Sequence, residues 1–138
     1  MAFAGGGQLA AAVSLAGGLG LIGGGYGDSV WLKEQFQLAG NAQVGVGFIT
    51  WSLARAPHLL SLALQHQPRA VMLSFGDPRP FASAIKEAGA CLICQCQNLG
   101  HVVQALAAGA DIVVAQGSEA GGHGAQRGTL SLVPEVEI

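Results

Sequence analysis

Five short apolar runs recur along the chain, and a stretch with helical periodicity separates each from the next. The runs, which start roughly 20 to 25 residues apart, are 19–22, 43–49, 70–74, 91–95 and 110–115. The helical stretches cover 8–16, 28–39, 57–65, 81–88 and 99–108. Alternation of this kind requires a parallel sheet, because each strand returns to the same edge through a crossover helix. The sequence therefore predicts an α/β fold.

Two parallel architectures are compatible with this alternation, a doubly wound sheet and a (β/α)8 TIM barrel, and periodicity alone does not separate them. A closed barrel typically needs roughly 250 residues, so a chain of 138 residues supplies about five of its eight units. We expect residues 1–138 to form one domain. An open sheet of this kind would also expose an edge able to pair with another chain, so a homo-oligomer is a further expectation.

The charge pattern excludes two classes of partner. The six Lys and Arg residues are scattered and the formal net charge is −2, so no basic stripe is available for nucleic acid. The apolar N-terminal stretch, 1–21, has no charged residue before it and is interrupted by glycines, which argues against a signal peptide or a membrane span. We therefore expect neither nucleic acid nor membrane as a partner.

Three cysteines, Cys91, Cys94 and Cys96, fall within one predicted strand. Neighbouring strand residues point to opposite faces, and no second group of ligands lies at zinc-site spacing, so we interpret the cysteines as core residues. An odd cysteine number without secretory context indicates a reducing compartment, and we expect a cytoplasmic protein.

The stretch 111–124 combines a buried-type strand with a glycine-rich loop. Its apolar run, 112–115, predicts a fully buried parallel strand. The loop that follows carries four hydrogen-bonding side chains between its glycines: Gln116, Ser118, Glu119 and His123. Polar groups directly after the carboxyl end of a buried parallel strand indicate a functional site.

The same loop carries a family resemblance. Residues 116–124, with the sequence QGSEAGGHG, resemble the signature loop of the nitronate monooxygenases, formerly called 2-nitropropane dioxygenases, which are FMN-dependent barrel enzymes. Three further stretches, 9–20, 44–48 and 108–111, agree in order and spacing. The resemblance implies a partial TIM barrel with about strands 2 to 6, and a member truncated at both ends. On this view the loops that hold the FMN phosphate in the family would follow Ile138.

The resemblance also implies individual roles. His123 takes the place of an active-site histidine that acts as a base toward nitroalkanes or binds the anionic nitronate. The other matched positions are cofactor contacts: Met1, Gly47, Gln95, Gln116, Gly121 and Gly122. Of these, Met1 aligns with the methionine of an Ala-Pro-Met-Ala segment, and Gln95 with a polar residue that reaches the isoalloxazine ring. Gly47 departs from the family, because many bacterial relatives have a flavin-contacting asparagine there.

The implied activity is FMN-dependent oxidation of alkyl nitronates by O2 to carbonyl compounds and nitrite. Two alternatives stay open: a flavin-dependent enoyl-acyl-carrier-protein reductase, which shares the Glu-Ala-Gly-Gly-His run and would consume NAD(P)H, and a non-catalytic truncated remnant. A histidine among glycines is more often a solvated loop residue, but the nine-residue match favours function for His123. We interpret Glu119 as a loop-ordering carboxylate and Trp51 as either a pocket wall or a packing residue. The remaining histidines, His58, His66 and His101, are expected on helix surfaces or at helix starts.

Overall fold

The structure is a computed structural model that describes residues 4–136. It contains a single sheet of five parallel strands in the order β1-β2-β3-β4-β5. The strands are β1 (Leu21–Gly23), β2 (Gly45–Ile49), β3 (Ala70–Ser74), β4 (Cys91–Cys96) and β5 (Ile112–Ala115). The helices are α1 (Gly7–Leu15), α2 (Ser29–Ala39), α3 (Thr50–Leu53), α4 (His58–Leu64), α5 (Arg79–Glu87), α6 (Leu99–Ala107) and α7 (Thr129–Val136). The predicted α/β fold is therefore confirmed.

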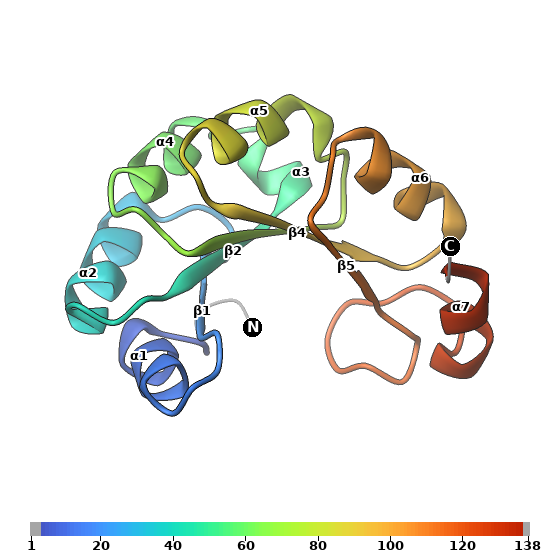
Figure 1. The fold of residues 1–138 in the computed structure, drawn as a ribbon, viewed down its shortest axis with the longest axis horizontal. Coiled ribbons are helices and arrows are strands. Elements are labelled where there is room, and N and C mark those ends of the chain that lie inside the picture. The colour runs from blue at the N-terminus through green and yellow to red at the C-terminus, as the bar shows by residue number, and fades with distance from the viewer. Residues whose placement is uncertain (1–3, 137–138) are drawn as a thin grey trace.

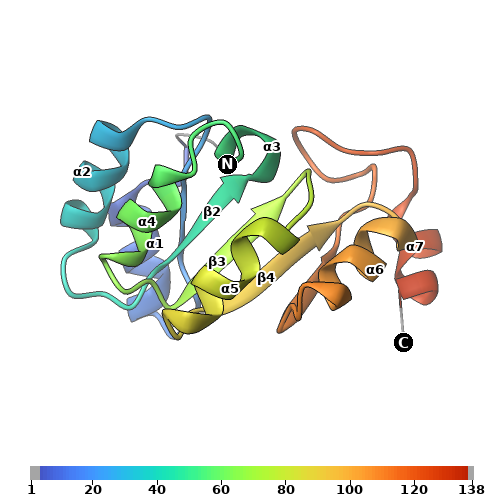
Figure 2. The same ribbon diagram turned by 90° about the horizontal axis from the view of Figure 1, so that it is seen from above.

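The sheet is curved into an arch, and its helices cover the convex side (Figure 1). Seen from above, α4, α5 and α6 lie side by side across the strands (Figure 2). A doubly wound sheet would place helices on both faces and reverse its strand order at a switch point, whereas here the strands follow one another in sequence. The arrangement is that of a partial (β/α)8 barrel.

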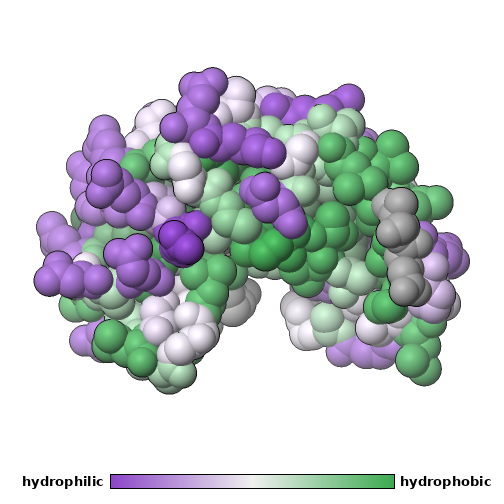
Figure 3. Space-filling model, viewed as in Figure 1, coloured by the Kyte–Doolittle hydropathy of each residue, from purple (hydrophilic) through white to green (hydrophobic). Residues whose placement is uncertain are grey.

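Successive residues of each strand point to opposite faces of the sheet, and these faces differ in burial. The outer face, under the helices, carries Ile22, Val46, Val71 and Leu92, all 0% exposed. The inner face, on the concave side, includes Gly47, Ile49, Met72, Ser74, Ile93, Gln95, Ile112 and Val114. Apolar side chains line part of this hollow (Figure 3). The outer face is thus the core of the molecule.

Local signals in the sequence account for several helix boundaries. Asp28, a predicted N-cap, accepts hydrogen bonds from the main-chain N–H groups of Val30 and Trp31, each at 2.9 Å. Gly89 and Gly109, predicted to end helices, have φ of +75° and +71° after α5 and α6. No helix within residues 4–136 has the length and apolar character needed to cross a membrane.

Three expectations about the fold were wrong. The strand at 112–115 is not fully buried, because β5 is an edge strand and its inner-face residues Ile112 and Val114 are 46% and 37% exposed. The segment around Trp51, which lies outside the predicted helices and strands, forms the single turn of α3, which is too short to show periodicity. Helix α7 was not predicted, since Pro134 interrupts its pattern.

Candidate active site

A hollow of about 290 Å³ lies at the carboxyl ends of the strands, the end at which barrel enzymes carry their active sites. Loops after β1, β3 and β5 surround it, and the inner face forms its floor. Its lining includes every predicted site residue that the structure describes: Gly47, Gln95, Gln116, Gly121, Gly122 and His123. The remaining predicted residue, Met1, lies outside the described residues. The structure brings these six positions together, and their roles stay predictions.

Gln95 is held in one orientation by its neighbour on the inner face. Ser74 is paired with it across β3 and β4, and the Ser74 hydroxyl donates to Gln95 Oε1 at 2.8 Å. With its oxygen engaged in this way, the amide offers its Nε2–H groups as donors to the hollow. Ser74 was not predicted as a site residue, although a polar residue at the end of an apolar strand was a usable signal.

Gln116 connects the end of β5 to the loop that carries His123. Its side chain is 8% exposed. Its Oε1 accepts from Gln97 Nε2 at 2.8 Å, and its Nε2 donates to the carbonyl oxygen of His123 at 2.9 Å. The buried side-chain amide of Gln116 therefore links the start of the signature loop to the main chain near its end.

His123 is exposed, and its ring meets the edge of the Phe75 ring at a centroid distance of 6.2 Å. Phe75 follows β3 and has φ of +61°, a left-handed conformation that is unfavourable for a bulky residue. Such strain persists only where the surrounding structure enforces it, and it gathers at functional sites. Sequence analysis missed Phe75, because no pattern in the sequence indicates its backbone conformation.

Glu119 of the signature loop is hydrogen-bonded to the first residue of α7. The Glu119 carboxylate accepts from the Thr129 main-chain N–H at 2.9 and 3.0 Å and from the Thr129 hydroxyl at 2.9 Å. Hydrogen bonds from its own main chain and from Thr129 lower the pKa of Glu119. A negative charge at a helix N-terminus is favourable, so the loop-ordering interpretation of Glu119 is confirmed.

Glycine keeps the floor of the hollow open. A Cβ atom added at Gly47 would meet only ordinary contacts at 3.9 Å, and one at Gly121 would meet nothing within 4 Å. Side chains at either position would therefore occupy the hollow itself. The partly apolar lining and the few amide donors of the hollow suit the ring system of a flavin. Among the described residues, no group of three His, Cys, Asp or Glu side chains could hold a metal ion.

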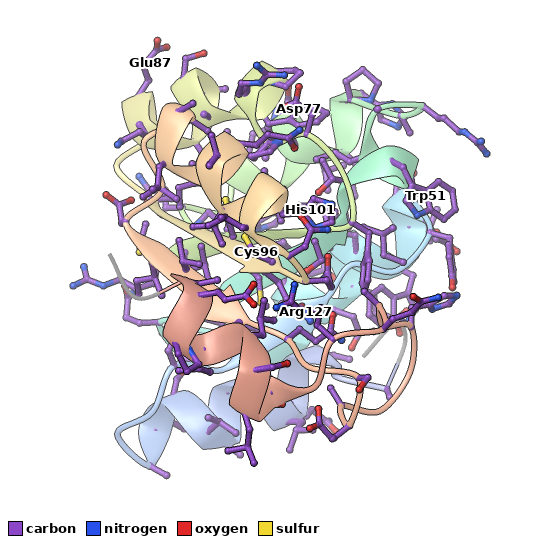
Figure 4. The ribbon with its side chains drawn as sticks, turned by 90° about the vertical axis from the view of Figure 1, so that its right-hand side faces the viewer. Trp51, Asp77, Glu87, Cys96, His101 and Arg127 are labelled. Carbon is purple, nitrogen blue, oxygen red and sulfur yellow. The ribbon has the colours of Figure 1, made fainter. Side chains whose placement is uncertain are left out.

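Several other residues considered from the sequence lie away from this hollow. Trp51 is on α3, where it packs near Tyr26 with ring centroids 6.0 Å apart and under the Arg55 guanidinium at 5.1 Å. It lines a separate groove between α3, α4 and α5. Its side chain lies at the outer edge of the molecule (Figure 4). His66 stacks on Phe36 at 4.5 Å, on the side of α2. Trp51 is therefore no wall of the candidate site.

The cysteines of β4 divide between the two faces. Cys94 and Cys96 belong to the outer face and are 3% and 2% exposed. Burial raises the pKa of each thiol to about 11. Cys91 is only half-buried. The core interpretation is thus confirmed for Cys94 and Cys96, and their thiols are unreactive near neutral pH.

His101 was expected on a helix surface or at a helix start, and it lies in the first turn of α6. Its ring also contacts the Gln97 side chain, with Nδ1 and Oε1 3.0 Å apart. Through Gln97 it is connected to Gln116 and so to the candidate site. Sequence analysis missed Gln97, although it too is a polar residue directly after the carboxyl end of a buried strand, as Gln116 is.

Comparisons with known proteins agree with this geometry. The nitronate monooxygenase family profile matches residues 46–137. A nitronate monooxygenase from Neurospora crassa is 31% identical over 94% of this chain. The aligned region covers 44% of that relative, so the chain spans less than half of its length.

Two solved structures superpose on most of the chain. FabK from Thermotoga maritima matches 99% of it with a TM-score of 0.90 and 34% identity, over 44% of the FabK chain. A nitroalkane oxidase from Streptomyces ansochromogenes matches 96% with a TM-score of 0.83 and 26% identity, over 51% of that chain. The similarity extends across all five strand–helix units.

Proposed function

The chain belongs to the nitronate monooxygenase family, and we propose that its hollow takes part in the FMN-dependent oxidation of alkyl nitronates by O2. One observation carries this proposal. Gln95, Gln116, His123 and the glycines at 47, 121 and 122 come from three separate segments of the chain, and all of them line one hollow. The activity itself is a proposal, because this chain spans less than half the length of the Neurospora crassa relative.

FMN, when bound, supplies the electron acceptor and the reaction with O2. The residues proposed to hold its ring are Gln95 and Gln116, as hydrogen-bonding amides, and the open glycine floor at Gly47, Gly121 and Gly122. Ser74 supports this role, because its hydroxyl fixes the Gln95 amide. These residues would orient the ring and exclude water from it.

His123 is proposed as the group that handles the substrate. A neutral imidazole can remove the proton from the carbon beside a nitro group. Its charged form can pair with the nitronate anion. Phe75 limits the imidazole on one side through the edge contact between their rings. The products are an aldehyde or ketone and nitrite.

The test uses the absorption spectrum of the purified 138-residue chain, desalted after incubation with FMN. We expect bound flavin near one per chain, and O2 uptake with an alkyl nitronate in the absence of NAD(P)H. His123→Asn should keep the flavin and lose roughly 100-fold or more of the oxidation of the neutral nitroalkane, because that substrate must first lose a proton from carbon. Flavin-dependent NAD(P)H consumption would instead support the reductase alternative. A chain that retains no flavin would favour the non-catalytic alternative and contradict the proposal for this chain.

The matched control is Trp51→Phe. Trp51 is 46% exposed, and it lines the separate groove between α3, α4 and α5. This variant should therefore bind flavin and oxidise nitronate as the unsubstituted chain does.

The cysteine states agree with the proposed cytoplasmic location, because all three cysteines are free thiols.

A further inference from the structure

We propose that Gln97 and His101 are positioning residues that set the direction of a hydrogen-bond chain ending on the main chain of His123. The importance of this hydrogen-bond chain for catalysis rests on the proposed function, while the existence of the hydrogen bonds does not. It begins at Asn98, the N-cap of α6, and passes through His101, Gln97 and Gln116. The chain thus joins the ends of β4 and β5 to the loop that carries the histidine.

The far end of the chain fixes its direction. The carbonyl oxygen of His123 can only accept, so Gln116 must present its Nε2 to that oxygen, 2.9 Å away. Gln116 Oε1 then faces Gln97, which must present its own Nε2, at 2.8 Å. Gln97 Oε1 in turn faces Nδ1 of His101 at 3.0 Å. His101 must therefore carry its proton on Nδ1.

The near end is compatible with the same tautomer. Asn98 Oδ1 accepts from the main-chain N–H of His101 at 2.9 Å, so the Asn98 amide presents Nδ2 to the other ring nitrogen. That nitrogen, Nε2, lies 3.4 Å from Nδ2, a long contact that suits an unprotonated Nε2. One equally long contact favours the opposite tautomer, the Gln97 main-chain N–H to Nδ1 at 3.4 Å, but the 3.0 Å contact from Nδ1 to Gln97 Oε1 is the shorter one and decides between them.

Burial makes the direction costly to reverse. Gln97 is 2% exposed and Gln116 is 8% exposed, so water has little access to the hydrogen bond between these two side chains. If one amide of the hydrogen-bond chain were flipped, its oxygen would lie against another oxygen, or its N–H group against another N–H group, in a region of low polarity. The three glycines around His123 offer little other restraint, since Cβ atoms at Gly121 and Gly122 would meet nothing within 4 Å. The Gln116 amide therefore limits where His123 can lie.

An isosteric substitution separates direction from shape. In Gln97→Glu the side chain keeps its size but, when ionised, only accepts. Gln116 must then turn its Nε2 toward residue 97, which leaves its Oε1 against the carbonyl oxygen of His123. The loop loses its tie, although no atom has been removed from the site. Gln35→Glu is the matched control, because Gln35 is also buried, at 8% exposed, and its Oε1 already accepts from Gly7 N–H at 2.9 Å.

The first measurement is the ¹⁵N NMR spectrum of the full 138-residue chain without flavin at neutral pH. We expect His101 to show a protonated Nδ1 and an unprotonated Nε2. The opposite tautomer would overturn the proposal. This result needs no variant, so it decides the question even if Gln97→Glu does not fold.

The second measurement is the backbone order parameter of His123. In Gln97→Glu we expect it to fall below about 0.6, the range of flexible segments, and in Gln35→Glu we expect no change. Equal order parameters in all three proteins would overturn the proposal. Because both measurements are made without FMN, failure to bind flavin would count against the proposed function and leave this inference standing.

Discussion

The two faces of the sheet are built from alternate residues of the same strands and do different work. In β3, Val71 and Leu73 point outward and are 0% and 2% exposed, while Met72 and Ser74 between them point inward and are half-buried. The outer residues pack under helices, and the inner residues border the hollow. One strand therefore supplies stability with one set of side chains and a binding surface with the other.

This difference means that substitutions one position apart should have separable consequences. Changes on the outer face remove buried contacts and act on the free energy of unfolding. Changes on the inner face remove few such contacts and act on what the hollow can bind. Four experiments test this separation.

The largest effect is expected from Leu92→Ala, since Leu92 is 0% exposed on the outer face. Truncation of a fully buried leucine costs about 2–5 kcal/mol of the free energy of unfolding, through lost burial and the cavity left behind. Chemical denaturation with urea measures it. Met72→Ala, the inner-face control, should cost less than half as much. Equal losses would mean that the inner face is a second core.

The cysteines of β4 report the two faces directly. Cys94 and Cys96 have a pKa of about 11, against 9.0 for an unperturbed thiol, so roughly 100-fold less thiolate is present at pH 8. A thiol reagent should therefore modify Cys91 first and the other two only after unfolding. Mass spectrometry of the labelled chain identifies the order. Simultaneous labelling of all three in the folded chain would contradict the burial of the outer face.

The sequence predicted the outer face well, because apolar runs alternate with stretches of helical periodicity along the chain. All five strands were found from apolar runs, and α2, α5 and α6 from their caps and closing glycines. In the candidate site, Gln116 and His123 were indicated by their position in a glycine-rich loop after a strand, and the family resemblance supplied their expected roles. The contacts Ser74–Gln95 and Gln97–Gln116 were not predicted, since they join residues of neighbouring strand–helix units that no periodicity pairs. The exposure of β5 also depends on its place in the sheet and not on its own residues.

A smaller effect is expected from Ser74→Ala on the inner face. Loss of the hydroxyl that donates to Gln95 Oε1 removes one part-buried hydrogen bond, worth about 0.5–1.5 kcal/mol of stability. The freed amide of Gln95 should weaken FMN binding more visibly than it lowers stability. Flavin titration and urea denaturation measure the two quantities. Ser61→Ala, on the exposed side of α4, should change neither.

The smallest change in stability is expected from Gly47→Ala. A methyl group here meets only contacts at 3.9 Å, and removing a glycine reduces the freedom of the unfolded chain, so stability should rise by at most about 1 kcal/mol. The methyl group nevertheless enters the hollow, and FMN affinity should fall. Thermal unfolding and flavin titration test this pair of outcomes. A destabilised variant would show that the inner face is packed more tightly than its geometry indicates.

The strand order has a consequence for how the molecule forms. Each strand pairs with the one that precedes it in the chain, so partners are separated by only roughly 20 to 25 residues. Closing such short loops costs little entropy, and every new strand finds its partner already made. The sheet can therefore grow on the ribosome in the order of translation, one strand–helix unit at a time. By the time the histidine loop emerges, the strands and Gln97, which holds the loop through Gln116, are already in place, and only the contact between Glu119 and α7 has still to form.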